Sequence, residues 1–171
     1  MEMDLKEYFS RVRNGDKEAF ALIYNELERP VFTIVHRIVQ SKQIAEDVTQ
    51  DLFVKLFVSP PEDSVKKPRA WIFQMARNLA IDTLRKKQCI DIDDVELTAD
   101  DEINNAIMRM DIESAISRLP QTEREIISLR INAQLHFIEI SHIVGLSVPA
   151  TYRNYRRAIQ TLRKLLDGGA L

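Results

Sequence analysis

The feature that most constrains the fold of this chain is an acidic segment, residues 89–113, that divides it into two parts. This segment carries nine Asp and Glu residues against one Lys or Arg, whereas residues 1–88 have a net charge of +2 and residues 114–171 of +4. Acidic residues alternate there with isolated apolar ones, a pattern typical of neither a packed helix nor a buried strand. The chain is therefore expected to form two small domains joined by an acidic linker.

The composition on both sides of the linker favours helices. Only 4 of the 171 residues are Gly and 6 are Pro, which leaves few positions for the turns of a many-stranded sheet. We therefore expect an all-α protein. Its expected parts are a helical bundle over residues 1–88, the acidic linker over 89–110 and a helix-turn-helix domain over 111–171.

Cysteine usage and the N-terminal sequence indicate a cytoplasmic protein. The single cysteine, Cys89, excludes an internal disulfide and indicates a reducing compartment. The N-terminal residues are acidic and polar where a signal peptide would be basic and then apolar, and no apolar run approaches ~18 residues. We therefore expect no membrane insertion.

Three helices are predicted before the linker. Apolar residues recur at helical spacing over 16–40, with Asp16 as the N-cap and Pro30 causing either a kink or a break between two abutting helices. A second helix is predicted over 43–57 and a third over 68–87. The third helix is expected to turn one row of side chains inward: Ile72, Met75, Leu79 and Thr83.

Three more helices with short joints are predicted after the linker, over 122–132, 137–144 and 148–166. Thr122 and Glu125 have the spacing of a capping box at the start of the first of them. A new domain is therefore expected to begin close to this point.

The joint before the last helix has the residues of a helix-turn-helix. Gly145 can adopt the positive φ that ends a helix, Ser147 can cap the next helix, and Pro149 fits its first turn. One side of the last helix is expected to be buried through Tyr155, Ala158 or Ile159, Leu162, and Leu165 or Leu166. The opposite side carries Arg153, Arg156, Arg157, Gln160, Arg163 and Lys164.

An arginine row of this kind can enter the major groove of DNA, where Arg pairs with guanine edges and with phosphates. The helical pattern alone leaves a protein-binding helical hairpin as an alternative. The charge asymmetry along the chain points toward nucleic acid, but it fits a solvated surface equally well.

Three sequence blocks in a fixed order resemble extracytoplasmic-function (ECF) sigma factors, the small two-domain members of the sigma-70 family. The blocks are AEDVTQDLFVKLF (45–57), PRAWIFQMARNLAIDTLRKK (68–87) and LPQTEREIISLRINAQLHFIEISHIVGLSVPATYRNYRRAIQTLRKLL (119–166). The resemblance implies a subunit that binds the largest and second-largest subunits of core RNA polymerase and recognises promoter DNA as duplex and as melted strand. It implies an anti-sigma protein as a further partner, and neither catalysis nor a cofactor or metal.

The resemblance assigns three surfaces to this chain. The surface that docks on the clamp helices of the largest polymerase subunit comprises Asp47, Gln50, Asp51 and Phe53. The segment that grips and melts the minus-ten element comprises Lys66, Lys67, Arg69, Trp71, Arg77, Asn78 and Arg85. The residues assigned to the minus-35 element are Tyr152, Arg153, Asn154, Arg156 and Arg157. By residue type alone, the first surface also fits a solvated helix face, and Trp71 also fits a core anchor.

The last domain departs from the family pattern at two turns. Residues 149–154 read Pro-Ala-Thr-Tyr-Arg-Asn where the family commonly has Gly-Thr-Val-Lys-Ser-Arg, so a small hydroxyl and a lysine are lost at expected contacts. Gln134 replaces a frequent glycine, and His136 replaces a better N-cap. These changes affect base preference more than the fold.

Two other functions fit part of the pattern. A stand-alone helix-turn-helix regulator would bind duplex operator DNA as a dimer, whereas this chain offers one recognition helix and no evident dimerising coiled coil. A helical adaptor that binds only protein is the alternative of another class.

Overall fold

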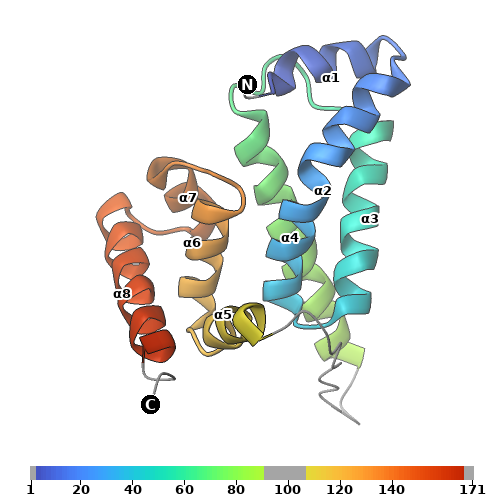
Figure 1. Cartoon of the computed structure of the whole chain (residues 1–171). Helices are drawn as coiled ribbons and strands as arrows, with labels where there is room; N and C mark the ends of the chain where they lie inside the picture. Colours follow the sequence, from blue (N-terminus) through green and yellow to red (C-terminus); the bar gives the residue numbers. More distant parts are fainter. Residues whose placement is uncertain (1–2, 91–106, 168–171) are drawn as a thin grey trace. The chain divides into compact units, whose positions relative to one another are not determined.

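The structure is a computed structural model that describes residues 3–90 and 107–167. These residues form the helices α1 to α8 and no strand within the described part, so the expected all-α fold is confirmed (Figure 1). The chain divides into two compact units, unit 1 (Met1–Val95) and unit 2 (Glu96–Leu171). Most of the predicted linker, residues 89–110, lies outside the described residues.

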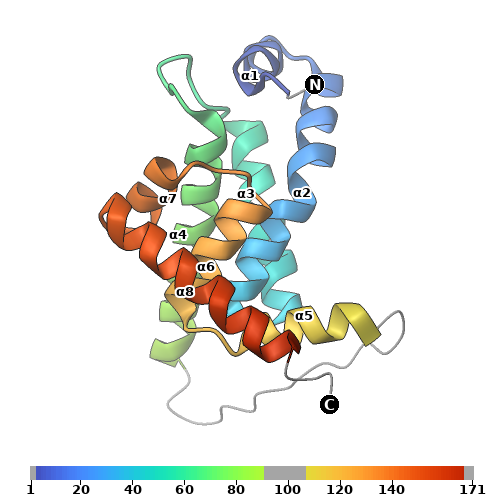
Figure 2. The same cartoon turned by 60° about the vertical axis from the view of Figure 1, so that its left-hand side comes forward.

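Unit 1 contains the helices α1 (Leu5–Arg13), α2 (Lys17–Val39), α3 (Lys42–Val58) and α4 (Pro68–Ile90). Helices α2, α3 and α4 pack against one another and lie side by side in Figures 1 and 2, and α1 packs on α2. The core of this bundle consists of fully buried side chains, the largest of which are Phe9, Ile23, Leu27, Ile34, Leu52, Leu56, Ile72 and Phe73.

Helix α1 precedes the first helix that the sequence predicts. Asp4 caps it by accepting hydrogen bonds from the N–H groups of Lys6 and Glu7. Phe9 and two aliphatic side chains at helical spacing turn into the core. The apolar stripe predicted from the sequence begins only at residue 16, so these three buried positions of α1 were not included in it.

The joint between α1 and α2 centres on Asp16, which caps α2 as predicted. Its carboxylate accepts a hydrogen bond from the Ala19 N–H at 3.0 Å and another from Arg11 Nε at 2.9 Å. Both hydrogen bonds favour the ionised carboxylate, and the Ala19 hydrogen bond has a larger effect on the pKa of Asp16 than the Arg11 hydrogen bond. The pKa of Asp16 is therefore lowered from its ordinary value of 3.8.

Helix α2 continues through Pro30, so a break into two abutting helices, one of the two outcomes allowed by the sequence, does not occur. Val31 and Ile34 extend the buried stripe that Ile23 and Leu27 begin. Their packing offsets the loss of the hydrogen bond that a proline nitrogen cannot donate.

The buried face of α4 differs from the predicted one. Of the four side chains predicted to turn inward, Ile72 is fully buried, whereas Met75, Leu79 and Thr83 are half-buried. The rest of the core face is formed by Phe73, Ala76 and Ala80. The prediction followed the larger side chains, but small alanines let helix backbones approach closely, and the bundle packs on them.

Unit 2 contains the helices α5 (Ile107–Ser117), α6 (Gln121–Ile131), α7 (Phe137–Val144) and α8 (Val148–Asp167). Helix α8 packs against the other three, and Figure 2 shows it at the front of the unit. Tyr155, Ile159 and Leu162 of α8 pack against a buried cluster of Leu119, Ile127 and Ala158, which is the side of α8 predicted to be buried.

The turn before α8 follows the prediction. Gly145 adopts a positive φ of 71°, and Ser147 Oγ accepts a hydrogen bond from the Ala150 N–H at 3.3 Å. At the preceding turn Gln134 also has a positive φ, 57°, at the position where the family pattern has glycine. The Glu139 carboxylate accepts a hydrogen bond from the His136 N–H at 2.8 Å and so supports the start of α7.

The start of α6 is a correction to the sequence analysis. The helix begins at Gln121, with Pro120 in the N-cap position and no side-chain cap. Thr122 is therefore already inside the helix, and the predicted capping box with Glu125 is wrong. Glu125 is buried instead and accepts a hydrogen bond from Gln121 Nε2 at 3.0 Å.

Candidate functional site

The outer side of α3 carries three of the residues predicted to dock on the polymerase. Asp47, Gln50 and Asp51 are exposed and lie at the spacing that places side chains on one face of a helix. Val48 and Leu52 fix the opposite side of α3 in the core. The helix therefore presents two carboxylates and one amide on a rigid support.

An apolar pocket adjoins this face, between α2 and α3. Its volume is about 430 Å³, and it is lined by Phe20, Tyr24, Gln50, Phe53, Val54 and Phe57. Two pairs of rings line it, with centroids 4.9 Å apart for Phe20 and Phe57 and 4.7 Å apart for Tyr24 and Phe53. A partner's apolar side chain can enter this pocket while its basic groups meet the carboxylates beside it.

Phe53 has a different role from the other predicted docking residues. Its side chain is only 3% exposed, so it forms the floor of the pocket rather than an open contact. The sequence analysis did not identify Tyr24, Val54 and Phe57, which are all exposed by at least 40%. Tyr24 belongs to the apolar stripe predicted over residues 16–40 but is 40% exposed, whereas Val54 and Phe57 are large apolar residues outside the predicted buried face of the second helix.

The basic residues assigned to the minus-ten element differ in exposure. Three of them are exposed: Lys66 and Lys67, which precede α4, and Arg85, which lies near its end. Arg69 and Arg77 are half-buried, and Arg69 Nη1 lies 3.7 Å from Glu26 Oε1 of α2. Arg69 therefore also links α4 to α2.

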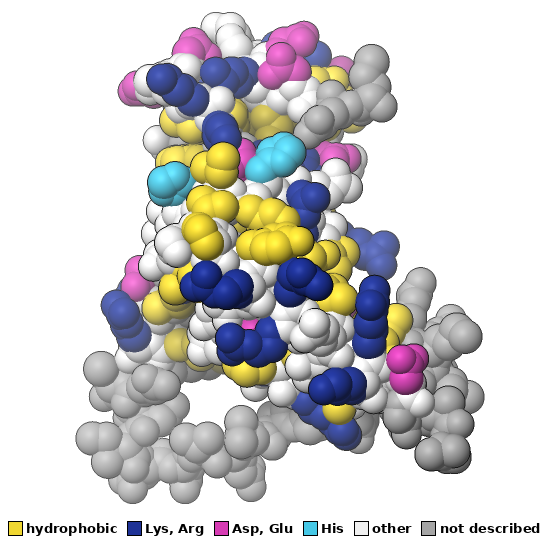
Figure 3. All heavy atoms as spheres, turned by 90° about the vertical axis from the view of Figure 1, so that its left-hand side faces the viewer, with side chains coloured by type: hydrophobic (Ala, Val, Ile, Leu, Met, Phe, Trp, Pro, Cys, Tyr) yellow, Lys and Arg dark blue, Asp and Glu magenta, His cyan; other side chains and the backbone are white. Residues whose placement is uncertain are grey.

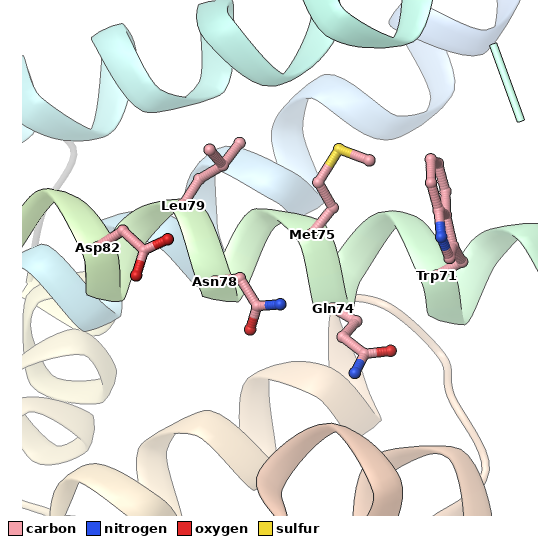
Figure 4. A pocket seen from close by; sticks show the side chains of 6 residues that line it. All are labelled: Trp71, Gln74, Met75, Asn78, Leu79 and Asp82. Carbon is pink, nitrogen blue, oxygen red and sulfur yellow. The ribbon is translucent and has the colours of Figure 1, made fainter. Parts of the chain in front are cut away.

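Trp71 and Asn78 line one pocket on α4, with a volume of about 250 Å³. Figure 4 shows two rows of side chains along the helix, each with one residue per turn. The apolar row is Trp71, Met75 and Leu79, and the polar row is Gln74, Asn78 and Asp82. This surface offers an aromatic face next to amide donors and acceptors, the groups that bind an unpaired base. Because Trp71 is half-buried, it supports the fold and remains accessible.

The predicted arginine row is accessible on α8. Tyr152, Arg153, Arg156 and Arg157 are exposed. Figure 3 looks onto α8 and shows Lys and Arg side chains gathered beneath a group of apolar ones. Asn154 is half-buried, and its Nδ2 donates to the Ala150 carbonyl at 2.9 Å, so its amide is partly engaged within the helix.

Arg157 is tied to a carboxylate of α6. Its Nη1 lies 3.6 Å from Glu123 Oε1, and the side chain of Glu123 is only 3% exposed, whereas that of Arg157 is 66% exposed. An acidic side chain is rarely buried without a partner. The sequence analysis did not identify Glu123, because helical spacing does not tell a buried acid near a helix start from a solvated one.

The ring of Tyr152 packs against the first residue of α7. Its centroid lies 5.3 Å from that of Phe137, at an interplanar angle of 88°. Phe137 also packs edge-on against Tyr155, and the guanidinium of Arg130 lies over its ring. Tyr152 is therefore exposed but held in place by an aromatic cluster.

Within residues 3–90 and 107–167, no group of His, Cys, Asp or Glu side chains is arranged to hold a metal ion. No helix in the same ranges combines the length and the apolar character needed to cross a bilayer.

Known proteins similar to this chain are sigma factors. Residues 23–89 match the family model of sigma-70 region 2. The ECF RNA polymerase sigma factor SigW of Bacillus subtilis is 27% identical, over 97% of this chain and 98% of its own length. The ECF RNA polymerase sigma factor SigK of Mycobacterium ulcerans is 24% identical, over 96% of this chain and 94% of its own length.

Two solved structures share the fold. The sigma factor RpoE from Bartonella quintana, solved with the anti-sigma factor NepR, has a TM-score of 0.69 and 21% identity over 86% of this chain and 96% of its own. CnrH, solved with the cytosolic domain of CnrY, has a TM-score of 0.65 and 20% identity over 95% of this chain and 97% of its own. Residues 23–89 therefore match sigma-70 region 2, and the chain over nearly its whole length is similar to ECF sigma factors of the sigma-70 family.

Proposed function

We propose that this chain binds core RNA polymerase and directs it to a two-part promoter, whose downstream element it helps to melt. The observation that best supports this proposal is the presence of a different accessible surface on each unit. Unit 1 presents an acidic face beside an apolar pocket on α3, and unit 2 presents exposed arginines on α8. The chain itself carries out no covalent chemistry in this role.

The α3 face is the proposed contact with the clamp helices of the largest polymerase subunit. Asp47 and Asp51 supply negative charge, Gln50 lies at the rim of the apolar pocket, and Phe53 forms its floor. An interface of this kind combines a buried apolar anchor with a charged rim. The polymerase helix that docks here is expected to carry basic residues around an apolar one.

The α4 surface is the proposed contact with the minus-ten element. Trp71 offers a face for stacking, and Asn78 offers hydrogen bonds to a base edge. Lys66, Lys67 and Arg85 are exposed and suited to contact phosphates, while Arg69 and Arg77 support the helix from half-buried positions. Binding unpaired bases better than stacked ones lowers the cost of opening the duplex.

The α8 surface is the proposed contact with the minus-35 element. The exposed Arg153 and Arg156 are suited to base edges and phosphates, with Arg157, Tyr152 and Asn154 beside them. The short turn before α8 and the exposed side chains on its N-terminal half support the helix-turn-helix proposed for this unit. The second-largest polymerase subunit is the proposed neighbour of unit 2.

An inhibitory protein is a further proposed partner. RpoE of Bartonella quintana was solved with an anti-sigma factor, and CnrH with the cytosolic domain of CnrY. We place the chain in the cytoplasm, where core polymerase and promoter DNA are found.

The test is transcription of fragmented genomic DNA by purified core polymerase with and without the full chain. We expect new transcript starts that share a two-part upstream sequence, and weak duplex binding by the chain alone. A stand-alone regulator would instead bind specific duplex DNA without polymerase. A helical adaptor that binds only protein would bind no duplex DNA, either alone or with polymerase. Identical starts with and without the chain would contradict the proposal.

A further inference from the structure

The N-terminal half of α8 presents an apolar surface next to its arginines. Val148 is 39% exposed and Tyr152, one turn later, is 48% exposed. Arg156 follows one further turn along the same side of the helix. The helix therefore carries an apolar row that ends in a cation, on the side that is proposed to meet DNA.

The Tyr152 ring is fixed before any partner binds. Phe137 supports it edge-on at 5.3 Å, and Phe137 is in turn held by Tyr155 at 5.2 Å and by the Arg130 guanidinium at 5.3 Å. Arg130 is itself anchored, because its Nη1 donates to the Leu135 carbonyl at 2.9 Å. A side chain held in this way loses little conformational entropy on binding, which is the property of a recognition contact.

The chemistry of the major groove identifies what this surface would contact. Hydrogen-bond donors and acceptors occupy most of each base edge there, and the 5-methyl group of thymine is the apolar exception. The exposed arginines Arg153 and Arg156 on the same helix complement the charge of the phosphates. An apolar row flanked by cations therefore fits a thymine edge in duplex DNA better than it fits a wholly apolar partner.

We propose that Val148 and Tyr152 form a thymine-reading surface, on which the 5-methyl group of a thymine in the upstream promoter element packs against the Tyr152 ring. This inference rests on the proposed function of unit 2 and specifies which base feature the helix recognises. The Tyr152 hydroxyl is not required for this contact, because the ring and the Val148 methyl groups supply the apolar surface.

The experiment replaces each thymine of a mapped upstream element with deoxyuridine, one position at a time, which removes only the methyl group. Promoter binding is measured with core polymerase and the full chain. At one or two positions deoxyuridine is expected to weaken binding about three- to fivefold, because the burial of one methyl group is lost. The Tyr152→Ala variant is expected to bind thymine and deoxyuridine templates equally at those positions.

Two matched variants serve as controls. Tyr152→Phe keeps the ring and is expected to keep the full preference for thymine, and Arg156→Ala is expected to bind more weakly overall but to keep the same preference. Val148→Ser provides a second removal of apolar surface and is expected to reduce the preference.

Three results would overturn the inference. Deoxyuridine could be tolerated at every position while wild-type protein still directs specific initiation, or the thymine preference could persist unchanged in Tyr152→Ala. The third result is that Tyr152→Ala lowers initiation by the same factor on thymine and deoxyuridine templates, and that Val148→Ser keeps the preference for thymine. This result would point to a contact with protein instead of DNA. Failure of the proposed function itself would differ, because no specific initiation would occur on unmodified templates.

Discussion

Adjacent arginines on α8 have different surroundings, although the sequence assigned them the same role. Arg157 lies 3.6 Å from Glu123, a carboxylate that is 3% exposed, whereas Arg156 is exposed on the neighbouring part of the helix. A buried carboxylate costs free energy unless a cation or a hydrogen-bond donor compensates it. Arg157 is therefore expected to contribute to folding as well as to DNA binding.

Substitution of these two arginines is expected to separate folding from DNA binding. Arg157→Ala is expected to lower the free energy of unfolding of unit 2 by about 1–3 kcal/mol, because it leaves the Glu123 carboxylate without its cation. Arg156→Ala is expected to change it by less than about 0.5 kcal/mol. Hydrogen exchange of the α6 and α8 backbone amides in the full chain measures both.

A double variant provides the control for this prediction. Glu123→Gln combined with Arg157→Ala is expected to recover part of the lost stability, since a neutral amide costs less to bury than a carboxylate. Equal effects of the two single substitutions on hydrogen exchange would show that the Glu123–Arg157 pair contributes nothing to stability.

Residue types and spacing predicted the exposed polar face of α3, but not the burial of Phe53 or the partial burial of Arg69, Arg77 and Asn154. The exposure of Asp47, Gln50 and Asp51 follows from the helical register of α3. The burial of Phe53 and Glu123 depends on tertiary contacts with Tyr24 and Arg157, which come from other helices. Local periodicity contains no information on such pairings.

At the scale of helices, the joint between α1 and α2 is expected to depend on pH through Asp16. The pKa of Asp16 is lowered in the folded protein, so its contribution to stability is fully present above the ordinary value of 3.8 and is lost as the pH falls through the lower folded value. Asp16→Ala is expected to lower the urea midpoint of unit 1 at neutral pH, and this difference from wild type should shrink at a pH below 3.8.

Fluorescence of the single tryptophan, Trp71, reports the unfolding of unit 1 within the full chain. Asp16→Asn keeps an oxygen that can cap α2 and removes the charge, so its midpoint at neutral pH should lie between those of wild type and Asp16→Ala. A difference between wild type and Asp16→Ala that is the same at neutral pH and at strongly acidic pH would rule out the titration of Asp16 as its cause.

The face of α3 gives a second prediction at this scale. Asp51→Lys is expected to weaken binding to core polymerase at least about tenfold, because it places like charges together at the rim of the proposed interface. Helicity should not change, since the side chain is exposed. Co-elution of the full chain with purified core polymerase, at a series of concentrations, measures the effect.

Glu62→Lys is the matched control, because it makes the same charge change at an exposed position in the loop before α4. It is expected to co-elute as wild type does. The docking assignment of α3 would be wrong if Asp51→Lys also bound core polymerase with unchanged affinity.

Helices with an apolar stripe bounded by turn residues were predicted with ends close to those observed. For α7 both ends agree, and for α3 and α8 the ends differ by a single residue. The prediction did not include α1 and α5, and it misplaced the buried face of α4, where Ala76 and Ala80 rather than Met75 and Leu79 meet the core. The capping box predicted at α6 is wrong for a different reason: the spacing of Thr122 and Glu125 does not reveal that the helix already begins at Gln121.

At the scale of the whole molecule, the two units carry different surfaces suited to different tasks. Unit 1 combines the acidic face of α3, which is the proposed docking surface, with an aromatic and amide-bearing surface on α4, and unit 2 presents cations on α8. The acidic residues 91–102 between them would be repelled by promoter DNA, which favours contacts through the units themselves. Promoter recognition is therefore expected to need both units in one chain.

The most direct test of this function is run-off transcription from one mapped promoter by core polymerase with the full chain. We expect a specific transcript that is lost when either promoter element is scrambled. Arg156→Ala should weaken binding to the intact promoter by about 1–3 kcal/mol but cause no further loss once the upstream element is scrambled. A transcript no stronger than that of core polymerase alone would contradict the assignment of this chain as a promoter-specificity subunit.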